Sequence, residues 1–371
     1  MPDRKIGAGA GGPSIYVCAG PGGVGKTTVS AALALGLAVG GRRVAVVTID
    51  PAKRLASALG LEHLGGEPQL SDPQRLLQGG VEVKGQLWAM TLDVKRTLDR
   101  LIGTLAPDSG AREEILGNRI YRDLSSALAG SQELSAVAKL YELHHEGGFD
   151  TIVLDTPPSR NALDFLDAPT RLERFLGGRA IAMFVAPGGL AARLIGRPTF
   201  LIFSIFARAA GIDLLGDLTA FFRSLTGTIE GMRERARGVG KLLRDPATTS
   251  FLIVTSPERD PAQEAIALGE HLVDEGMPFG GLIVNRVHVD GLGGHTLGEV
   301  KALLAPELGE RLAERVASNL ADFDVLVRRD QETIAHLRGA LGDQRPILIP
   351  QLDEDVHDID SLVKIAAHLA G

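Results

Sequence analysis

A run of glycines followed by a lysine and two threonines is the feature of this sequence that most plainly could do chemistry. Residues 20–28 read GPGGVGKTT. Glycines let the backbone curl so that successive N–H groups point at phosphate oxygens, and a helix starting there adds its positive end. The lysine would reach the β- and γ-phosphates of a nucleotide, and the first threonine hydroxyl would bind Mg²⁺. The spacing predicts a loop that binds Mg-ATP through Gly20, Gly22, Gly23, Val24, Gly25, Lys26, Thr27 and Thr28.

Two aspartates at the ends of apolar runs could complete such a site. Asp155 closes the run Thr151–Asp155, after which Thr-Pro-Pro breaks the chain. A carboxylate there would hold Mg²⁺ together with Thr27, through water. Asp50 follows the run Val44–Ile49 and could orient or deprotonate an attacking water. Each aspartate could instead cap the helix that follows it, and the residues alone leave that alternative open.

The rest of the chain supplies the strands and helices that must position these side chains. Short β-branched runs alternate with helical segments, which is typical of a parallel sheet covered by helices. The runs are apolar almost throughout, as expected of strands buried on both faces. We expect one doubly wound, mostly parallel α/β P-loop domain over residues 1–371, with a helix at Val24–Val39 after the glycine loop. The expected strands are Ser14–Ala19, Val44–Ile49, Leu87–Leu92, Thr151–Asp155, Phe251–Thr255, Leu282–Asn285 and Ile347–Ile349.

The stretch between Leu92 and Phe251 is helical in pattern except for the strand that ends at Asp155. Residues 169–245 carry twelve lysines and arginines against six acidic residues, although the whole chain has a net charge of −7. The same residues hold seven of the twelve phenylalanines. We interpret residues 169–245 as an apolar, basic helical subdomain inserted into an acidic core.

Phe200, Phe203 and Phe206 recur every three residues, with leucine and isoleucine between them. A helix that is apolar all round must be buried, either in a core or against a partner. The segment could line a groove for an apolar client, pack internally, or form a face for another protein. Nearby arginines could rim such a groove or contact an anionic membrane surface.

Composition narrows the classes of protein. Hydrophobic residues make up 44% and charged residues 23% of 371, which is typical of a globular chain. The negative net charge disfavours a nucleic-acid partner, and no apolar run reaches the roughly 18 residues of a membrane helix. The one cysteine, Cys18, cannot form an internal disulfide, which fits a reducing compartment. We therefore expect a cytoplasmic protein.

Four segments together resemble the arsenite-pump and tail-anchored-protein-targeting ATPases, a branch of the dimeric deviant P-loop ATPases that also contains MinD and ParA. The segments are GPGGVGKTT (20–28), IDPAKRLASALGL (49–61), DTPPSRNAL (155–163) and IVNRV (283–287). The resemblance implies a doubly wound sheet with a helical subdomain, and ATP hydrolysis by a dimer. It also implies that Asp50 activates water, that Asp155–Asn161 is a second switch, and that Asn285 reads the adenine.

The sequence departs from the family pattern in its loop and its cysteines. The family usually has a lysine that crosses the dimer where this chain has Pro21, which offers neither a charge nor a backbone donor. A paralogous subunit that keeps the lysine could complete the site, or Lys53, Arg54 or Arg160 could substitute for it. The third alternative is a slow or inactive site. A single cysteine supports neither metalloid binding nor a zinc-bridged dimer.

These observations predict an ATPase that couples hydrolysis to binding or targeting an apolar or membrane-protein client. The first alternative is a positioning or regulatory switch of the MinD/ParA kind, which predicts an amphipathic C-terminal membrane helix or a basic face. The tail Ile359–Leu369 has a helical apolar pattern but only one lysine. A metalloid-pump motor is disfavoured by the cysteine count, and a small-molecule kinase by the lack of a dedicated acceptor site.

Overall fold

A computed structural model of the chain describes most of its residues. These are residues 5–6, 12–49, 54–61, 63–78, 80–119, 121–122, 125, 131–177, 221, 224–343, 345–352 and 359–369. For residues 54, 131, 133, 159–166 and 175 it describes the backbone only.

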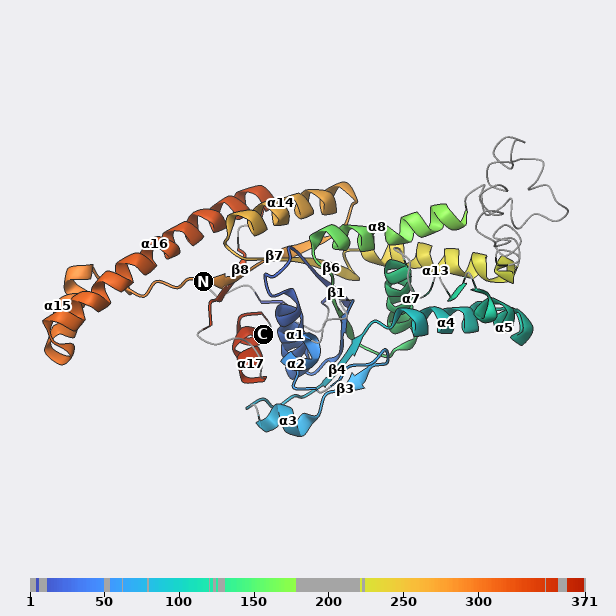
Figure 1. The fold of residues 1–371 in the computed structure, drawn as a ribbon, viewed down its shortest axis with the longest axis horizontal. Coiled ribbons are helices and arrows are strands. Elements are labelled where there is room, and N and C mark those ends of the chain that lie inside the picture. The colour runs from blue at the N-terminus through green and yellow to red at the C-terminus, as the bar shows by residue number, and fades with distance from the viewer. Residues whose placement is uncertain are drawn as a thin grey trace, which may run out of the picture.

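Eight strands form one sheet in the order β3-β4-β2-β5-β1-β6-β7-β8 (Figure 1). All neighbouring strands are parallel except β3 and β4, which are antiparallel. The two-residue β3 was not expected, because two exposed residues carry no periodic pattern. The strands are β1 (Ile15–Ala19), β2 (Arg43–Thr48), β3 (Gln69–Leu70), β4 (Gln86–Thr91), β5 (Thr151–Asp155), β6 (Thr249–Thr255), β7 (Phe279–Val287) and β8 (Ile347–Pro350).

Helices cover both faces of this sheet, so the prediction of a doubly wound α/β fold is confirmed. On one face, α1 (Lys26–Val39), α2 (Arg54–Ala58), α3 (Pro73–Gln78) and α17 (Ile359–Leu369) share an apolar core with the sheet. The core of the other face is formed with α7 (Ser131–Glu146), α8 (Ser159–Leu176), α13 (Thr226–Arg244), α14 (Arg259–Asp274) and α16 (Glu310–Leu341). Every residue of β1 and β5, the two central strands, is buried, as the apolar runs predicted.

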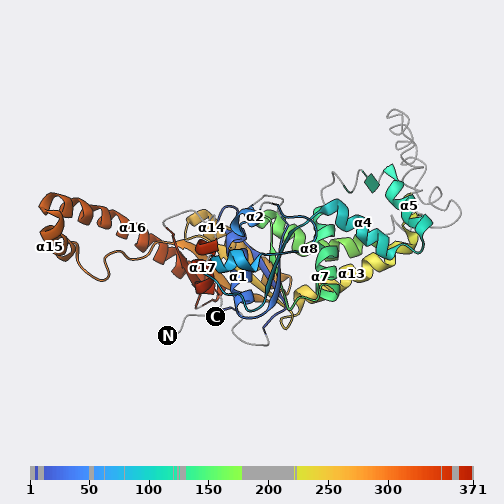
Figure 2. The same ribbon diagram turned by 90° about the horizontal axis from the view of Figure 1, so that it is seen from below.

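A third apolar cluster lies beyond one end of the sheet, and we call it the helical subdomain. It joins α4 (Val94–Leu105) and α5 (Ser109–Gly117) to parts of α7, α8 and α13. In both views these helices extend from the same side of the sheet (Figures 1 and 2). Both α8 and α13 contribute to the sheet core and to this cluster: Ala168 and Val239 pack in the core, and Leu176 and Met232 in the subdomain.

The inserted subdomain predicted at residues 169–245 remains a prediction, because residues 178–220 and 222–223 lie outside the described residues. Phe200, Phe203 and Phe206 fall in that range. Phe221 is described, and it is buried in the cluster of the helical subdomain. Helices α4, α5 and α7 precede the predicted range, yet they belong to the same cluster.

At the opposite end of the molecule, α15 (Leu297–Leu308) and the first part of α16 extend beyond the sheet (Figures 1 and 2). Among the helices that the structure describes, none is both long and apolar enough to cross a membrane.

Candidate nucleotide-binding site

The glycine loop joins β1 to α1 and packs tightly against its neighbours. A Cβ at Gly20 would lie 1.9 Å from the carbonyl oxygen of Val254 on β6. At Gly25, a Cβ would lie 2.5 Å from Nδ2 of Asn285, and φ is 90°, a left-handed conformation. Only glycine tolerates such close approaches and such a backbone, so the sequence pattern has a direct steric cause at these two positions.

Lys26 opens α1 and turns back over the loop. Its Nζ donates a hydrogen bond to the carbonyl oxygen of Pro21 at 2.7 Å, and the side chain is buried. The ammonium group is therefore held inside the curl of the loop, where the N–H groups of a P-loop gather around phosphate oxygens. A phosphate oxygen could replace the Pro21 carbonyl as its acceptor.

Asp155 lies at the carboxyl end of β5, beside the strand that leads into the loop. Its Oδ2 accepts hydrogen bonds from Thr27 Oγ1 at 2.7 Å and from Thr48 Oγ1 at 2.9 Å. Pairing of Cys18 on β1 with Asp155 on β5 sets this position, because carboxyl ends of parallel strands meet at one edge. The structure thus brings together Thr27 and Asp155, as predicted for a Mg²⁺ site. Sequence reasoning missed Thr48, whose one signal was a hydroxyl residue ending an apolar strand.

Asn285 on β7 closes the other side of the loop. Its Nδ2 donates to the carbonyl oxygen of Val24 at 2.8 Å, and the residue is buried. The next residue, Arg286, has a φ of 61°, and the pairing of β7 with β8 shifts between Val284 and Val287. A left-handed arginine inside a strand is uncommon and marks a bulge that re-aims the chain. The role of Asn285 as the adenine reader stays a prediction.

These residues fit a magnesium nucleotide. The tight glycine cradle leaves backbone N–H groups for phosphate oxygens, and the buried ammonium of Lys26 offers a positive charge beside them. Thr27 and Asp155 present a hydroxyl and a carboxylate side by side, and Mg²⁺ prefers oxygen ligands of this kind.

Comparison with known proteins now assigns the family. The family model described as "Anion-transporting ATPase" matches residues 14–291, which include every part of the site described above. The chain belongs to this family.

Individual relatives of this ATPase share few identical residues with it, but they match over most of the chain. ATPase ARSA2 of Chlamydomonas reinhardtii is 26% identical over 356 residues, which cover 94% of this chain and 82% of that protein. ATPase GET3A of Arabidopsis thaliana is 28% identical over 272 residues, covering 73% of this chain and 66% of that protein. ATPase GET3 of Malassezia globosa is 26% identical over 272 residues, covering 73% and 71%. By family the chain is an ATPase, as the glycine loop and the two aspartates predicted.

Asp50, the predicted general base, lies outside the described residues, and so does Lys53. The residue before Asp50 is described: the carbonyl oxygen of Ile49 accepts a hydrogen bond from Gln132 Nε2 at 2.8 Å. Because Gln132 belongs to α7, the segment that leads to Asp50 is tied directly to a helix that enters the helical subdomain.

Cys18 has no exposed surface in this ATPase. Burial raises the pKa of its thiol to about 12. A thiol that stays protonated is a poor nucleophile and a poor metal ligand. Cys18 is therefore a small residue of the apolar core.

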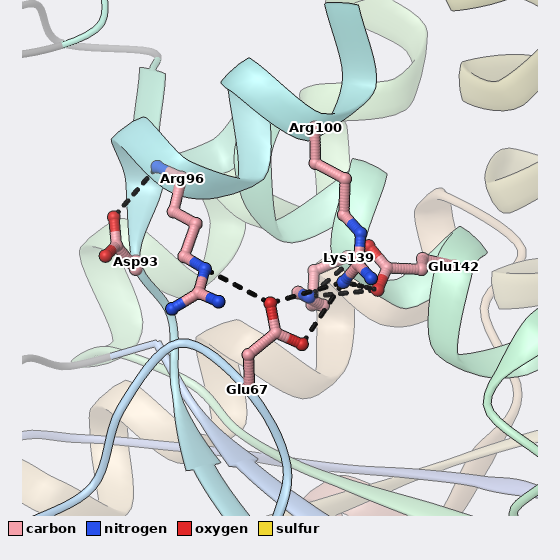
Figure 3. Close-up of polar contacts among 6 residues, drawn as sticks. All are labelled: Glu67, Asp93, Arg96, Arg100, Lys139 and Glu142. Atoms are coloured by element: carbon pink, nitrogen blue, oxygen red, sulfur yellow. Dashed lines mark hydrogen bonds and ion pairs between the residues drawn. The ribbon is translucent and has the colours of Figure 1, made fainter. Parts of the chain in front are cut away.

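A network of ion pairs joins the core of the ATPase to its helical subdomain (Figure 3). Glu67, from the loop before β3, contacts Nε of Arg96 at 3.2 Å and Nη1 of Arg100 at 3.1 Å, both on α4. Arg100 Nη1 also contacts Glu142 of α7 at 2.8 Å, and Glu142 pairs with the buried Lys139 at 3.1 Å. Ion pairs thus link Glu67 to α4, and they add to the apolar packing that already joins α4 to α7.

Proposed function

We propose that this chain hydrolyses Mg-ATP as a dimer and uses the cycle to bind or target an apolar or membrane-protein client. The observation that carries the nucleotide part is the 2.7 Å hydrogen bond from Thr27 to Asp155 beneath the glycine loop. A hydroxyl and a carboxylate lying side by side are what a magnesium site would need, and Thr27 directly follows the lysine that would contact the phosphates.

Each residue of the site has a distinct task in this proposal. The loop N–H groups and Lys26 would bind the β- and γ-phosphate oxygens, and Asn285 would contact the base. Thr27 and Asp155 would hold Mg²⁺, which neutralises phosphate charge when it is bound. Asp50 would orient the attacking water and accept its proton.

The link from hydrolysis to a client rests on α8. This helix starts at Ser159, four residues after Asp155, and ends at Leu176 in the cluster of the helical subdomain. A shift of residues 156–158, which join β5 to α8, on loss of the γ-phosphate would therefore move α8 and the helices packed on it. The apolar residues of the range 169–245 are the proposed client surface.

One observation favours this proposal over a MinD/ParA-like switch that binds membranes through its C-terminus. The apolar side of α17 is buried: Leu362, Ile365 and Leu369 pack in the same core as α1. A helix whose apolar face is covered by its own domain has little left to insert into a lipid surface.

We further propose that the second subunit is a paralogue that carries the lysine absent at Pro21. A cation supplied across an interface to transferring phosphates is worth about 10³–10⁵ in rate. Pro21 offers only its carbonyl, which Lys26 of the same chain already contacts. A substitute within the chain, from Lys53, Arg54 or Arg160, is the competing explanation, and a homodimer would then suffice.

Two experiments on the purified full-length chain test these proposals separately. The first measures ATP turnover and oligomeric state for the wild type and for Pro21→Lys. Slow turnover in the wild type that rises in the lysine variant supports a missing partner, whereas brisk turnover by a wild-type homodimer rejects it.

The second experiment measures capture of a fluorescent peptide that carries an uncharged membrane-spanning segment. We expect capture that depends on Mg-ATP and is lost in the double variant Phe203→Ser, Phe206→Ser, with ATP turnover retained. If the folded wild type and the folded variant capture the peptide equally well, the proposed client surface is rejected. The proposal for the nucleotide site would not be affected.

A further inference from the structure

A second group of potential ligands lies away from the nucleotide site, where α8 and α14 pack together. Asp167 comes from α8, His271 from the last turn of α14, and Glu275 from the residue that ends α14. One ligand atom from each of the three lies within 4.8 Å of the other two. His271 and Glu275 are four residues apart, a spacing that places both on one side of a helix.

The imidazole of His271 carries a nitrogen that lacks a partner. Its Nε2 is buried and has no hydrogen-bond partner, although the side chain as a whole is 29% exposed. The closest carboxylate oxygen, Oδ1 of Asp167, is 3.7 Å away, which is too long for a hydrogen bond. Two ligands of a tetrahedral Zn²⁺, each bound at about 2.1 Å, lie roughly 3.4 Å apart, so the gap suits a shared ion.

Each of the two carboxylates also contacts an arginine. Arg171 contacts Oδ2 of Asp167 at 3.6 Å, so that Oδ1 is the oxygen facing His271. Arg244 contacts Oε2 of Glu275 at 2.9 Å and also donates to the Glu275 backbone carbonyl at 3.0 Å. Partners that orient the ligands in this way are typical of the surroundings of metal sites.

The site is partly open to solvent, because the side chain of Glu275 is 36% exposed. The positive charges of the two arginines offset the negative charges of the two carboxylates. We therefore expect this site to bind a metal ion more weakly than a closed site with four protein ligands.

We propose that Asp167, His271 and Glu275 bind one divalent transition-metal ion, with Zn²⁺ the best match to one imidazole and two carboxylates. The ion would fasten α8 to α14 at the point where α8 leaves the sheet for the helical subdomain. Because α8 starts only four residues after Asp155, metal occupancy would set how far that helix moves. This inference stands apart from the client and dimer proposals, because it rests on none of the nucleotide-site residues.

The test uses untagged full-length protein without nucleotide, titrated with Co²⁺ in the presence of excess Mg²⁺. We expect one equivalent of Co²⁺ to give the visible absorption of a low-symmetry site and Zn²⁺ to displace it. His271→Gln and Asp167→Asn each remove a direct ligand, so each should weaken Co²⁺ binding by more than the roughly 10- to 100-fold that loss of an outer-shell partner costs. The matched control is His295→Gln, since His295 is 56% exposed and its Nδ1 lies 4.0 Å from Glu299; this variant should bind as the wild type does.

Thermal unfolding distinguishes a metal site from a simple ion pair between α8 and α14. Zn²⁺ should raise the melting temperature of the wild type and of His295→Gln, and leave that of His271→Gln unchanged. The proposal is overturned if the wild type takes up no Co²⁺, or if folded His271→Gln binds it as tightly as the wild type.

Discussion

The nucleotide edge of the sheet and the contact between Glu67 and α4, which we call the junction, are held together by different forces. At the edge, β1 and β5 are fully buried and the glycine loop packs directly on Val254 and Asn285. At the junction, Glu67, Arg96 and Arg100 meet as ion pairs whose side chains are 38%, 61% and 52% exposed.

The difference has an energetic meaning. A fully buried aliphatic side chain stabilises the fold by about 1.5–3 kcal/mol, whereas an exposed ion pair contributes about 0–1 kcal/mol. The edge is therefore expected to keep its shape through the ATP cycle, while the ion pairs of the junction can rearrange at little cost. A nucleotide-driven switch requires both a rigid nucleotide site and a contact that can rearrange.

The largest expected effect comes from removing the charge at the fixed edge. Lys26→Ala deletes the ammonium that would neutralise the phosphates, so we expect ATP binding and turnover to fall by about 10³-fold or more. Equilibrium binding and a turnover assay would measure this. Unchanged affinity and turnover in the folded variant would contradict the assignment of the loop.

Asp50→Asn keeps the shape of the side chain and removes its basicity. If Asp50 is the general base, turnover falls by about 10²-fold or more while ATP still binds. Single-turnover kinetics beside a binding measurement would separate the two effects. Near-normal turnover would instead assign Asp50 to capping the helix that follows it.

A pair of glycine variants tests whether the edge is as tightly packed as described. Gly23 and Gly25 both have positive φ, but a Cβ at Gly23 meets nothing within 4 Å, whereas one at Gly25 meets Asn285 at 2.5 Å. Both alanine variants carry the backbone strain of about 1–3 kcal/mol, and Gly25→Ala adds the steric clash. Chemical unfolding should therefore show a larger loss for Gly25→Ala, and equal losses would mean that the loop can yield.

The smallest effect on stability is expected at the junction. Glu67→Gln removes the carboxylate shared by Arg96 and Arg100, and unfolding free energy should fall by no more than about 1 kcal/mol. Glu270→Gln, at an exposed glutamate of α14, is the matched control. A loss of several kcal/mol in Glu67→Gln alone would show that the junction is a rigid part of the core.

Much of the nucleotide edge could be predicted because its chemistry is local in sequence. The loop, Lys26, Thr27 and the strand ending in Asp155 all lie in short segments whose spacing sets their geometry. Thr48 escaped notice because it reaches Asp155 only through the pairing of β2 with β5. Glu67, Arg100 and Glu142 were missed for a similar reason: they are distant in sequence, and single charged residues on exposed faces carry no pattern.

The helical subdomain illustrates a second limit of prediction from sequence. Phenylalanine content and positive charge drew attention to residues 169–245, but the described cluster also draws on α4, α5 and α7. Tyr121 and Ile115 are buried there, in a stretch whose composition is ordinary. Packing among helices follows from their arrangement in space, and composition alone does not give that arrangement.

Amide hydrogen exchange, compared with and without a non-hydrolysable Mg-ATP analogue, tests most directly whether the nucleotide edge drives the helical subdomain. We predict that protection of α8 and α4 changes on nucleotide binding in the wild type and stays constant in Lys26→Ala, with β1 and β5 protected throughout. Identical protection of α8 and α4 in a wild-type protein shown to hold the analogue would contradict the account.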